Sequence, residues 1–152
     1  MASPLLSFDS WRTYVSATGA TKETVGQKLG LPAGSLMQEF GYDEDVDFDL
    51  RDALEDFLGT ELLDEDDQEV VDGILLWWRA EDGDLVDGLM DVLATLDEGG
   101  VVWLLTPKNG REGHIPPVEI QEAAPLAGLH VTTSESLAHD WAASRLVMKQ
   151  GK

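Results

Sequence analysis

The sequence contains no cysteine, few basic residues and no long apolar run. The absence of cysteine excludes disulfide bonds, a thiolate nucleophile and cysteine-ligated zinc or iron–sulfur centres. No apolar stretch approaches the roughly 20 residues that cross a bilayer, and the N-terminus lacks a basic region followed by an apolar core. We therefore expect a cytoplasmic protein without a membrane span or a signal peptide.

Acidic residues outnumber basic residues by 30 to 10, and the net charge is −20. Such a surface repels nucleic acids and anionic membranes, because both are also negative. The excess is densest between Glu39 and Asp72, where sixteen acidic residues accompany a single base, Arg51. A solvated face explains this charge without a partner, and a docking surface for a basic protein is the alternative. The acidic face would comprise Asp43, Glu44, Asp45, Asp64, Glu65, Asp66 and Asp67.

Two apolar segments, residues 70–78 and 101–105, flank a segment with the periodicity of an amphipathic helix. This helix is expected to begin at Asp82 or Asp84, to run to about residue 96 and to be stopped by Gly99 and Gly100. A buried strand, a helix and a second buried strand form a βαβ unit with parallel strands.

The other elements extend this unit in both directions along the chain. We expect helices at residues 21–29, 46–58 and 116–127, and strands at residues 35–40, 130–133 and 142–148, the last two pairing antiparallel. The order predicts one α/β domain over residues 21–150, with a three-layer αβα, Rossmann-like architecture. Its sheet would be mostly parallel with one antiparallel C-terminal strand. Residues 1–20 are expected to form a flexible arm.

This order resembles the class I methyltransferase variant of the Rossmann fold over residues 29–148. Residues 96–101 (LDEGGV) and 127–129 (AGL) are similar to the turns that lead into the fifth and sixth strands of that family. Those enzymes bind S-adenosylmethionine over a glycine-rich turn after the first strand. Here that position, residues 39–45 (EFGYDED), holds one glycine among bulky and acidic residues. The resemblance implies a reduced methyltransferase-like fold without a competent methyl-donor site.

Six short blocks stand out in the sequence: residues 38–43 (QEFGYD), 61–66 (ELLDED), 75–79 (LLWWR), 82–85 (DGDL), 103–108 (WLLTPK) and 140–141 (DW). Together they resemble an actinobacterial family of unknown function, DUF3052. They span the chain after the N-terminal arm. The resemblance implies a small cytoplasmic protein without an assigned reaction, and it supplies no catalytic residue.

No catalytic residue, cofactor or metal ligand is predicted. The sequence has no Gly-x-Ser-x-Gly, Walker or Gly-x-Gly-x-x-Gly motif, and its three histidines lack metal-like spacing. Alternating aspartates from Asp43 to Asp49 resemble the start of an EF-hand loop. However, Phe48 and Leu54 stand where that loop needs glycine and glutamate. A helix N-terminus with a solvated acidic face explains these aspartates better.

Ligands of open α/β sheets bind at the C-terminal ends of the strands. That edge is expected to gather Gly41, Tyr42, Trp78, Arg79, Thr106, Lys108 and Arg111. Lys108 and Arg111 beside a helix start could hold a carboxylate or phosphate, and Arg79 would add to this site. Alternatively, these cations offset the acidic surface. Trp77 and Trp78 must point to opposite faces of the sheet, so one is expected in the core and the other beside the cleft.

The leading hypothesis is a non-catalytic binding or regulatory protein that uses the acidic face or the strand-end cleft. Its partner would be a basic protein. The alternative is an enzyme or small-ligand sensor, degenerate and methyltransferase-like, that binds an anionic small molecule in the cleft. A homodimer formed through an exposed sheet edge is a third possibility, and the sequence leaves the oligomeric state open.

Overall fold

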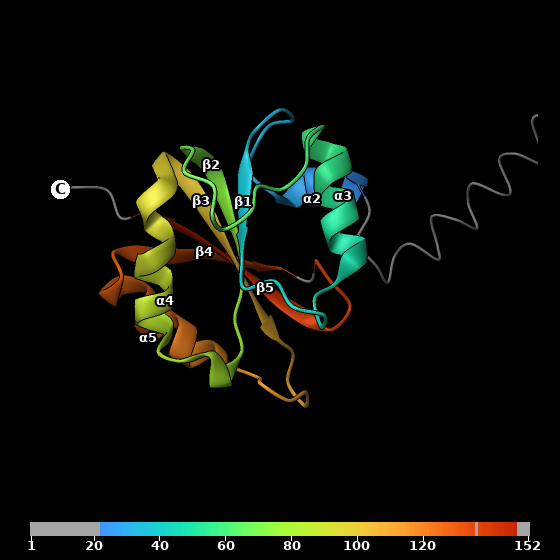
Figure 1. Ribbon diagram of the computed structural model, residues 1–152. Helices are drawn as coiled ribbons and strands as arrows, with labels where there is room; N and C mark the ends of the chain where they lie inside the picture. Colours follow the sequence, from blue (N-terminus) through green and yellow to red (C-terminus); the bar gives the residue numbers. More distant parts are fainter. Residues whose placement is uncertain (1–21, 136, 149–152) are drawn as a thin grey trace, which may run out of the picture.

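A sheet of five strands separates two pairs of helices, as the computed structural model shows (Figure 1). The structure describes residues 22–135 and 137–148, so the expected arm over residues 1–20 lies outside the described residues. On one face lie α2 (Lys22–Lys28) and α3 (Phe48–Leu58), and on the other lie α4 (Leu85–Val92) and α5 (Pro117–Leu126). This arrangement confirms the three-layer αβα prediction. None of the helices in the described ranges combines the length and apolarity that a membrane crossing requires.

The sheet has the strand order β1-β2-β3-β5-β4. Its strands are β1 (Met37–Phe40), β2 (Val71–Trp77), β3 (Leu96–Pro107), β4 (Leu129–Glu135) and β5 (Trp141–Met148). β2 pairs parallel to both β1 and β3, whereas β5 lies between β3 and β4 and runs antiparallel to both. The sheet is therefore mostly parallel with one antiparallel C-terminal strand, as predicted.

The centre of the sheet is apolar on both faces. Leu75 and Trp77 of β2 pack in the core under α2 and α3, and Ile74 and Leu76 pack in the core under α4 and α5. Because helices cover both faces, β2 is a near-continuous apolar run instead of an alternating one. Trp78, the next residue, is only half-buried and packs with the α4–α5 core. The prediction that Trp77 and Trp78 point to opposite faces is confirmed.

The segment between α4 and β3 differs from the prediction. The α-helix ends at Val92, a 3-10 turn follows at Leu93–Thr95, and β3 already begins at Leu96. Gly99 and Gly100 therefore lie inside the strand, at a shift of register against β2. A Cβ atom on Gly100 would lie 2.8 Å from the carbonyl oxygen of Asp72. The glycines allow the two strands to approach at this bulge, and they do not stop the helix.

Aspartates begin the two helices that follow parallel strands. The Asp47 carboxylate accepts a hydrogen bond from the Leu50 amide at 2.9 Å, and the Asp84 carboxylate accepts one from the Val86 amide at 3.0 Å. These caps satisfy amides that have no partner within their own helix. They place the N-termini of α3 and α4 at the strand-end edge of the sheet (Figure 1).

Candidate functional site

The turn after β1 approaches the end of β2 closely. Gly41 has φ +79°, and a Cβ atom at this position would collide with the carbonyl oxygen of Trp77. Only glycine adopts this backbone conformation readily and also leaves room for that carbonyl group. The single glycine of this turn is therefore required by packing within the protein.

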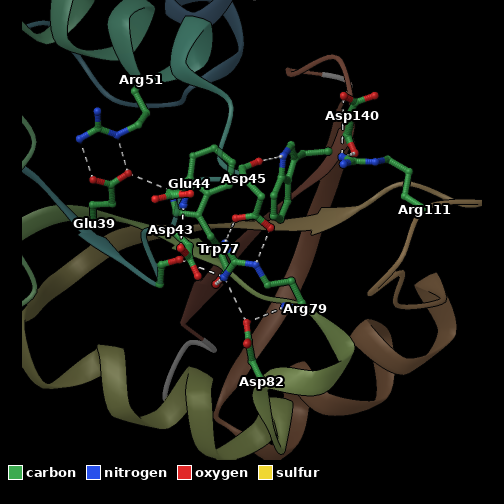
Figure 2. A network of polar contacts seen from close by, with 12 residues as sticks. Glu39, Asp43, Glu44, Asp45, Arg51, Trp77, Arg79, Asp82, Arg111 and Asp140 are labelled. Atoms are coloured by element: carbon green, nitrogen blue, oxygen red, sulfur yellow. Dashed lines mark hydrogen bonds and ion pairs between the residues drawn. The ribbon is translucent and has the colours of Figure 1, made fainter.

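Arg79 fills the space between this turn and the end of β2 (Figure 2). Its Nη1 donates to the carbonyl oxygens of Gly41 at 2.9 Å and Trp77 at 3.3 Å. Its Nε and Nη2 donate to the two carboxylate oxygens of Asp45, at 3.1 and 2.6 Å. Nη1 also reaches the carboxylate of Asp82 at 3.2 Å. The residue is 8% exposed, so other residues of the same chain surround the guanidinium.

These contacts keep both partners of the ion pair charged. The hydrogen bond from Arg79 lowers the pKa of Asp45, which burial alone would raise. For Arg79, burial lowers the pKa of the guanidinium, but the hydrogen bonds to Asp45 and Asp82 outweigh it and leave the pKa raised. The charge of Arg79 is thus balanced inside the chain, which weakens the prediction that Arg79 adds to an anion site.

Trp141 of β5 completes this network. Its ring meets the ring of Trp77 edge-to-face, with centroids 4.9 Å apart, and the guanidinium carbon of Arg79 lies 5.2 Å from the Trp141 ring centroid. The indole Nε1 of Trp141 donates to the carbonyl oxygen of Asp45 at 3.3 Å. The ion pair is therefore fastened to the sheet by an aromatic pair as well as by hydrogen bonds.

A second ion pair joins β1 to α3 (Figure 2). Glu39, 7% exposed, accepts two hydrogen bonds from Arg51, at 2.7 Å from Nε and 2.9 Å from Nη2. It also accepts one from the indole Nε1 of Trp77 at 2.9 Å. The hydrogen bond to Glu39 raises the pKa of Arg51. The one base in the acidic stretch is therefore engaged inside the fold.

A cavity of about 480 Å³ opens beside Arg79, and we call it the strand-end cavity. Four of the predicted cleft residues line it, namely Gly41, Tyr42, Trp78 and Arg79. Carboxylates also line it, from Asp43, Glu65, Asp82 and Asp91. Acidic and aromatic walls suit a positively charged group better than an anion.

The other predicted cleft residues lie elsewhere. Thr106 and Lys108 line a separate cavity next to α5, which we call the α5 cavity. Arg111 is exposed, donates to the carbonyl oxygen of Asp140 at 3.2 Å and lies 3.8 Å from its carboxylate. The predicted cleft is therefore divided into two cavities, and Arg111 lines neither of them.

The acidic face is built from two turns at the same edge of the sheet. Its exposed members are Asp43, Glu44, Asp45, Asp64, Glu65 and Asp66, whereas Asp67 is half-buried. The loop that carries the last four acids is held by Gln38, which is fully buried. The Gln38 Nε2 atom donates to the carbonyl oxygens of Asp64 and Asp67, at 2.8 and 2.9 Å. A buried amide thus fixes the position of the acidic loop.

Some residues of these cavities were not expected from the sequence. Asp91 lies on α4 among apolar residues and faces the strand-end cavity. Ser144 lies on β5 between inward-facing Ala142 and Leu146, and the alternation of that strand could have indicated a polar group on a buried face. Within the described ranges, no group of three or more histidine, aspartate or glutamate side chains is placed to hold a metal ion.

Solved structures with a similar fold define the structural class. The pyocyanin biosynthetic protein PhzM is similar, with a TM-score of 0.58 and 13% identity; the match covers 85% of this chain and about half, 54%, of PhzM. A SAM-dependent methyltransferase from Aquifex aeolicus has a TM-score of 0.55 and 15% identity, covering 88% of this chain and 93% of that chain. At such low identity these similarities show the fold alone, a methyltransferase-like Rossmann fold.

Residues 26–150 match the family described as "Protein of unknown function (DUF3052)", and the chain belongs to that family. It is 52% identical to an uncharacterized protein of Mycobacterium tuberculosis (strain ATCC 25618 / H37Rv) over 140 residues, which is 92% of this chain and 87% of that relative. The resemblance stated from the sequence blocks is confirmed.

Proposed function

We propose that this chain is a non-catalytic binding protein that presents its acidic face to a basic segment of another protein. The observation that carries the proposal is the position of Arg79. Its guanidinium bridges the turn after β1, the end of β2 and Asp45, in the region where ligands of open α/β sheets bind. Arg79 and its partners occupy the space between the turn after β1 and the end of β2, and the acidic surface around the neighbouring cavity is left for recognition.

The charge around Arg79 supports a cationic partner. Asp43 and Glu65 come from different turns and line the same cavity, next to the half-exposed ring of Tyr42. Carboxylates beside aromatic rings suit lysine and arginine side chains, which combine a positive head with an apolar stem. Complementary charge also accelerates the encounter between two proteins.

The alternative function is a small-ligand sensor or altered enzyme that uses the strand-end cavity. Its support is the size of that cavity, about 480 Å³, which is within the range of small-molecule sites. The carboxylates of Asp43, Glu65 and Asp91 oppose the anionic ligand expected from the sequence. A ligand of this cavity would therefore be positively charged or neutral.

Affinity capture from the cells that produce the protein tests the proposal. We expect a basic protein to be retained at low salt and released as the ionic strength rises. A variant with five neutralising substitutions in the acidic face should no longer retain this basic protein: Asp43→Asn, Glu44→Gln, Asp64→Asn, Glu65→Gln and Asp66→Asn. A control variant has the same change of net charge outside the acidic face and should still retain the basic protein: Glu23→Gln, Asp97→Asn, Glu98→Gln, Glu119→Gln and Glu122→Gln. Equal retention by both variants would exclude the acidic face as the docking surface.

A further inference from the structure

The α5 cavity has a volume of about 480 Å³. It borders β3, β5 and β4, whereas the acidic face borders β1 at the other end of the strand order. Its walls come from the end of β3, the start of α5 and the hairpin of β4 and β5. Ile115 and Ile120 supply apolar surface and are nearly fully buried. Predominantly apolar walls with a few convergent polar groups are typical of small-molecule sites.

Hydroxyl groups line the sheet side of this cavity. Thr106 is 1% exposed and Ser144 is 6% exposed. Leu104 pairs with Ser144 across β3 and β5, and Thr106 follows two residues later, so both hydroxyls are on the same face of the sheet. Ser134 of β4 pairs with Ser144 and also lines the cavity.

Thr106 and Ser144 both border the cavity rather than a closed part of the core. Within residues 22–135 and 137–148, the buried side-chain atoms without a partner are Trp78 Nε1 and Arg145 Nε, so neither hydroxyl is a buried unpaired group. A hydroxyl group can donate one hydrogen bond and accept others. Two such groups facing one cavity are therefore positioned to bind a polar group that enters it.

His114 adds an acceptor to the wall. Its Nδ1 lies 2.9 Å from the carbonyl oxygen of Pro107. A carbonyl oxygen can only accept, so Nδ1 carries the proton and Nε2 of the neutral ring is left as an acceptor. The cavity thus offers hydroxyl groups that can donate or accept and an imidazole that accepts.

The charges on the wall favour an uncharged head group. Lys108 and Glu135 both line the cavity and have opposite signs, and Glu135 also lies 3.5 Å from the amine of Lys28. A ligand head placed between Thr106 and Ser144 would meet neutral groups. Burying a charge there without a counter-charge is unfavourable. We propose that the α5 cavity binds a small organic molecule with an apolar body and an uncharged hydrogen-bonding head, a function separate from the acidic face.

Three probes with one apolar body and different heads test this inference on the full chain: 4-phenylbutanol, 4-phenylbutyrate and 4-phenylbutylamine. We expect the alcohol to shift the amide NMR signals of residues 104–106 and 142–144 and to bind more tightly than either charged analogue. Equal or tighter binding of the acid or the amine would overturn the neutral-head assignment. Absence of shifts with all three probes would overturn the site itself.

Variants then assign the contacts. Thr106→Val and Ser144→Ala should each weaken binding of the alcohol about fivefold, the typical effect of one lost hydrogen bond. Ala142→Leu should abolish it by filling the cavity. Thr133→Val, on the opposite face of β4, should leave the affinity unchanged. Thermal melting would check that each variant is folded. Unchanged affinity in folded Thr106→Val and Ser144→Ala proteins would contradict the role of the hydroxyls, and neither outcome depends on the acidic face.

Discussion

The Nη2 atom of Arg79 lies 2.6 Å from a carboxylate oxygen of Asp45, and this ion pair joins the end of β2 to the turn that leads into α3. The two residues are 34 positions apart in the sequence. Because Arg79 is buried and also binds the Gly41 carbonyl group, the pair holds together the strand ends that border the candidate site.

Removing the Asp45 carboxylate should destabilise the fold. Asp45→Asn leaves Arg79 buried with one charged partner fewer, but Asp45 is partly exposed, so solvent reduces the effect. We expect a loss of roughly 1–2 kcal/mol in the free energy of unfolding, measured with urea. Asp52→Asn on the exposed side of α3 is the control and should change this free energy by less than about 0.5 kcal/mol. Equal stabilities of the two variants would contradict the role of the pair.

The same ion pair makes the free energy of unfolding depend on pH. The folded protein lowers the pKa of Asp45 below its value in the unfolded chain, about 3.9. The contribution is therefore complete at neutral pH and is lost as the pH falls through the folded pKa. We expect the difference in unfolding free energy between the wild type and Asp45→Asn to stay constant from pH 7 to 5 and to shrink below about pH 4. A difference that grew with acid would contradict this assignment.

Comparing Gly41 with Gly59 tests how closely the turn after β1 approaches the end of β2. Both have positive φ, but a Cβ atom on Gly59 would meet no neighbour within 4 Å, whereas one on Gly41 would collide with Trp77. Gly59→Ala should cost about 1–2 kcal/mol from backbone strain alone. Gly41→Ala should cost roughly 3 kcal/mol or more, because the collision adds to the strain. Similar melting temperatures for both variants would show that the strand ends can separate.

Gln38 should control the order of the acidic loop. Gln38→Met keeps the volume but removes the donor to the carbonyl oxygens of Asp64 and Asp67. We expect a loss of roughly 1–3 kcal/mol and faster hydrogen exchange of the amides of residues 64–67. Thr95→Val removes only the hydroxyl that donates to the Gln38 Oε1 atom, so the loop should stay protected. Unaltered exchange in Gln38→Met would mean that other contacts hold the loop.

S-adenosylmethionine should not stabilise this protein. Arg79 fills the turn after β1, and large side chains line the neighbouring cavity where a methyl-donor site has a glycine-rich loop. A ligand at a hundredfold excess over its dissociation constant adds about 2.7 kcal/mol to the free energy of unfolding. We expect no change in melting temperature with about 1 mM of the compound. A rise of several degrees would favour the enzyme or sensor alternative.

The apolar runs, the helical periodicity and the caps in the sequence predicted most of the fold. Residues 70–78 and 101–105 read as buried parallel strands because helices cover both faces, and that holds for β2 and β3. The prediction that Gly99 and Gly100 stop the helix was wrong. A glycine that follows a helical pattern can either end the helix or form a bulge in the next strand. Only the approach of Gly100 to the Asp72 carbonyl group decides between these roles.

The candidate site was harder to predict, because its contacts join distant segments. Asp45 reads as one more acid in an exposed run, and Arg79 reads as a cation available to a ligand. Their pairing depends on how the turn after β1 folds over the end of β2. The α5 cavity likewise depends on the packing of α5 against β5, and periodicity within one strand carries no information about the space between elements.

The perpendicular indoles of Trp77 and Trp141, with Arg79 beside them, have a practical consequence. Two strongly absorbing rings in fixed contact couple their electronic transitions, and a nearby positive charge shifts the emission of the ring that it touches. Near-ultraviolet circular dichroism and intrinsic fluorescence therefore report on this part of the molecule without any label. An experimenter can follow the loosening of the strand ends, by acid or by an approaching partner, as a change of optical signal in the unmodified protein.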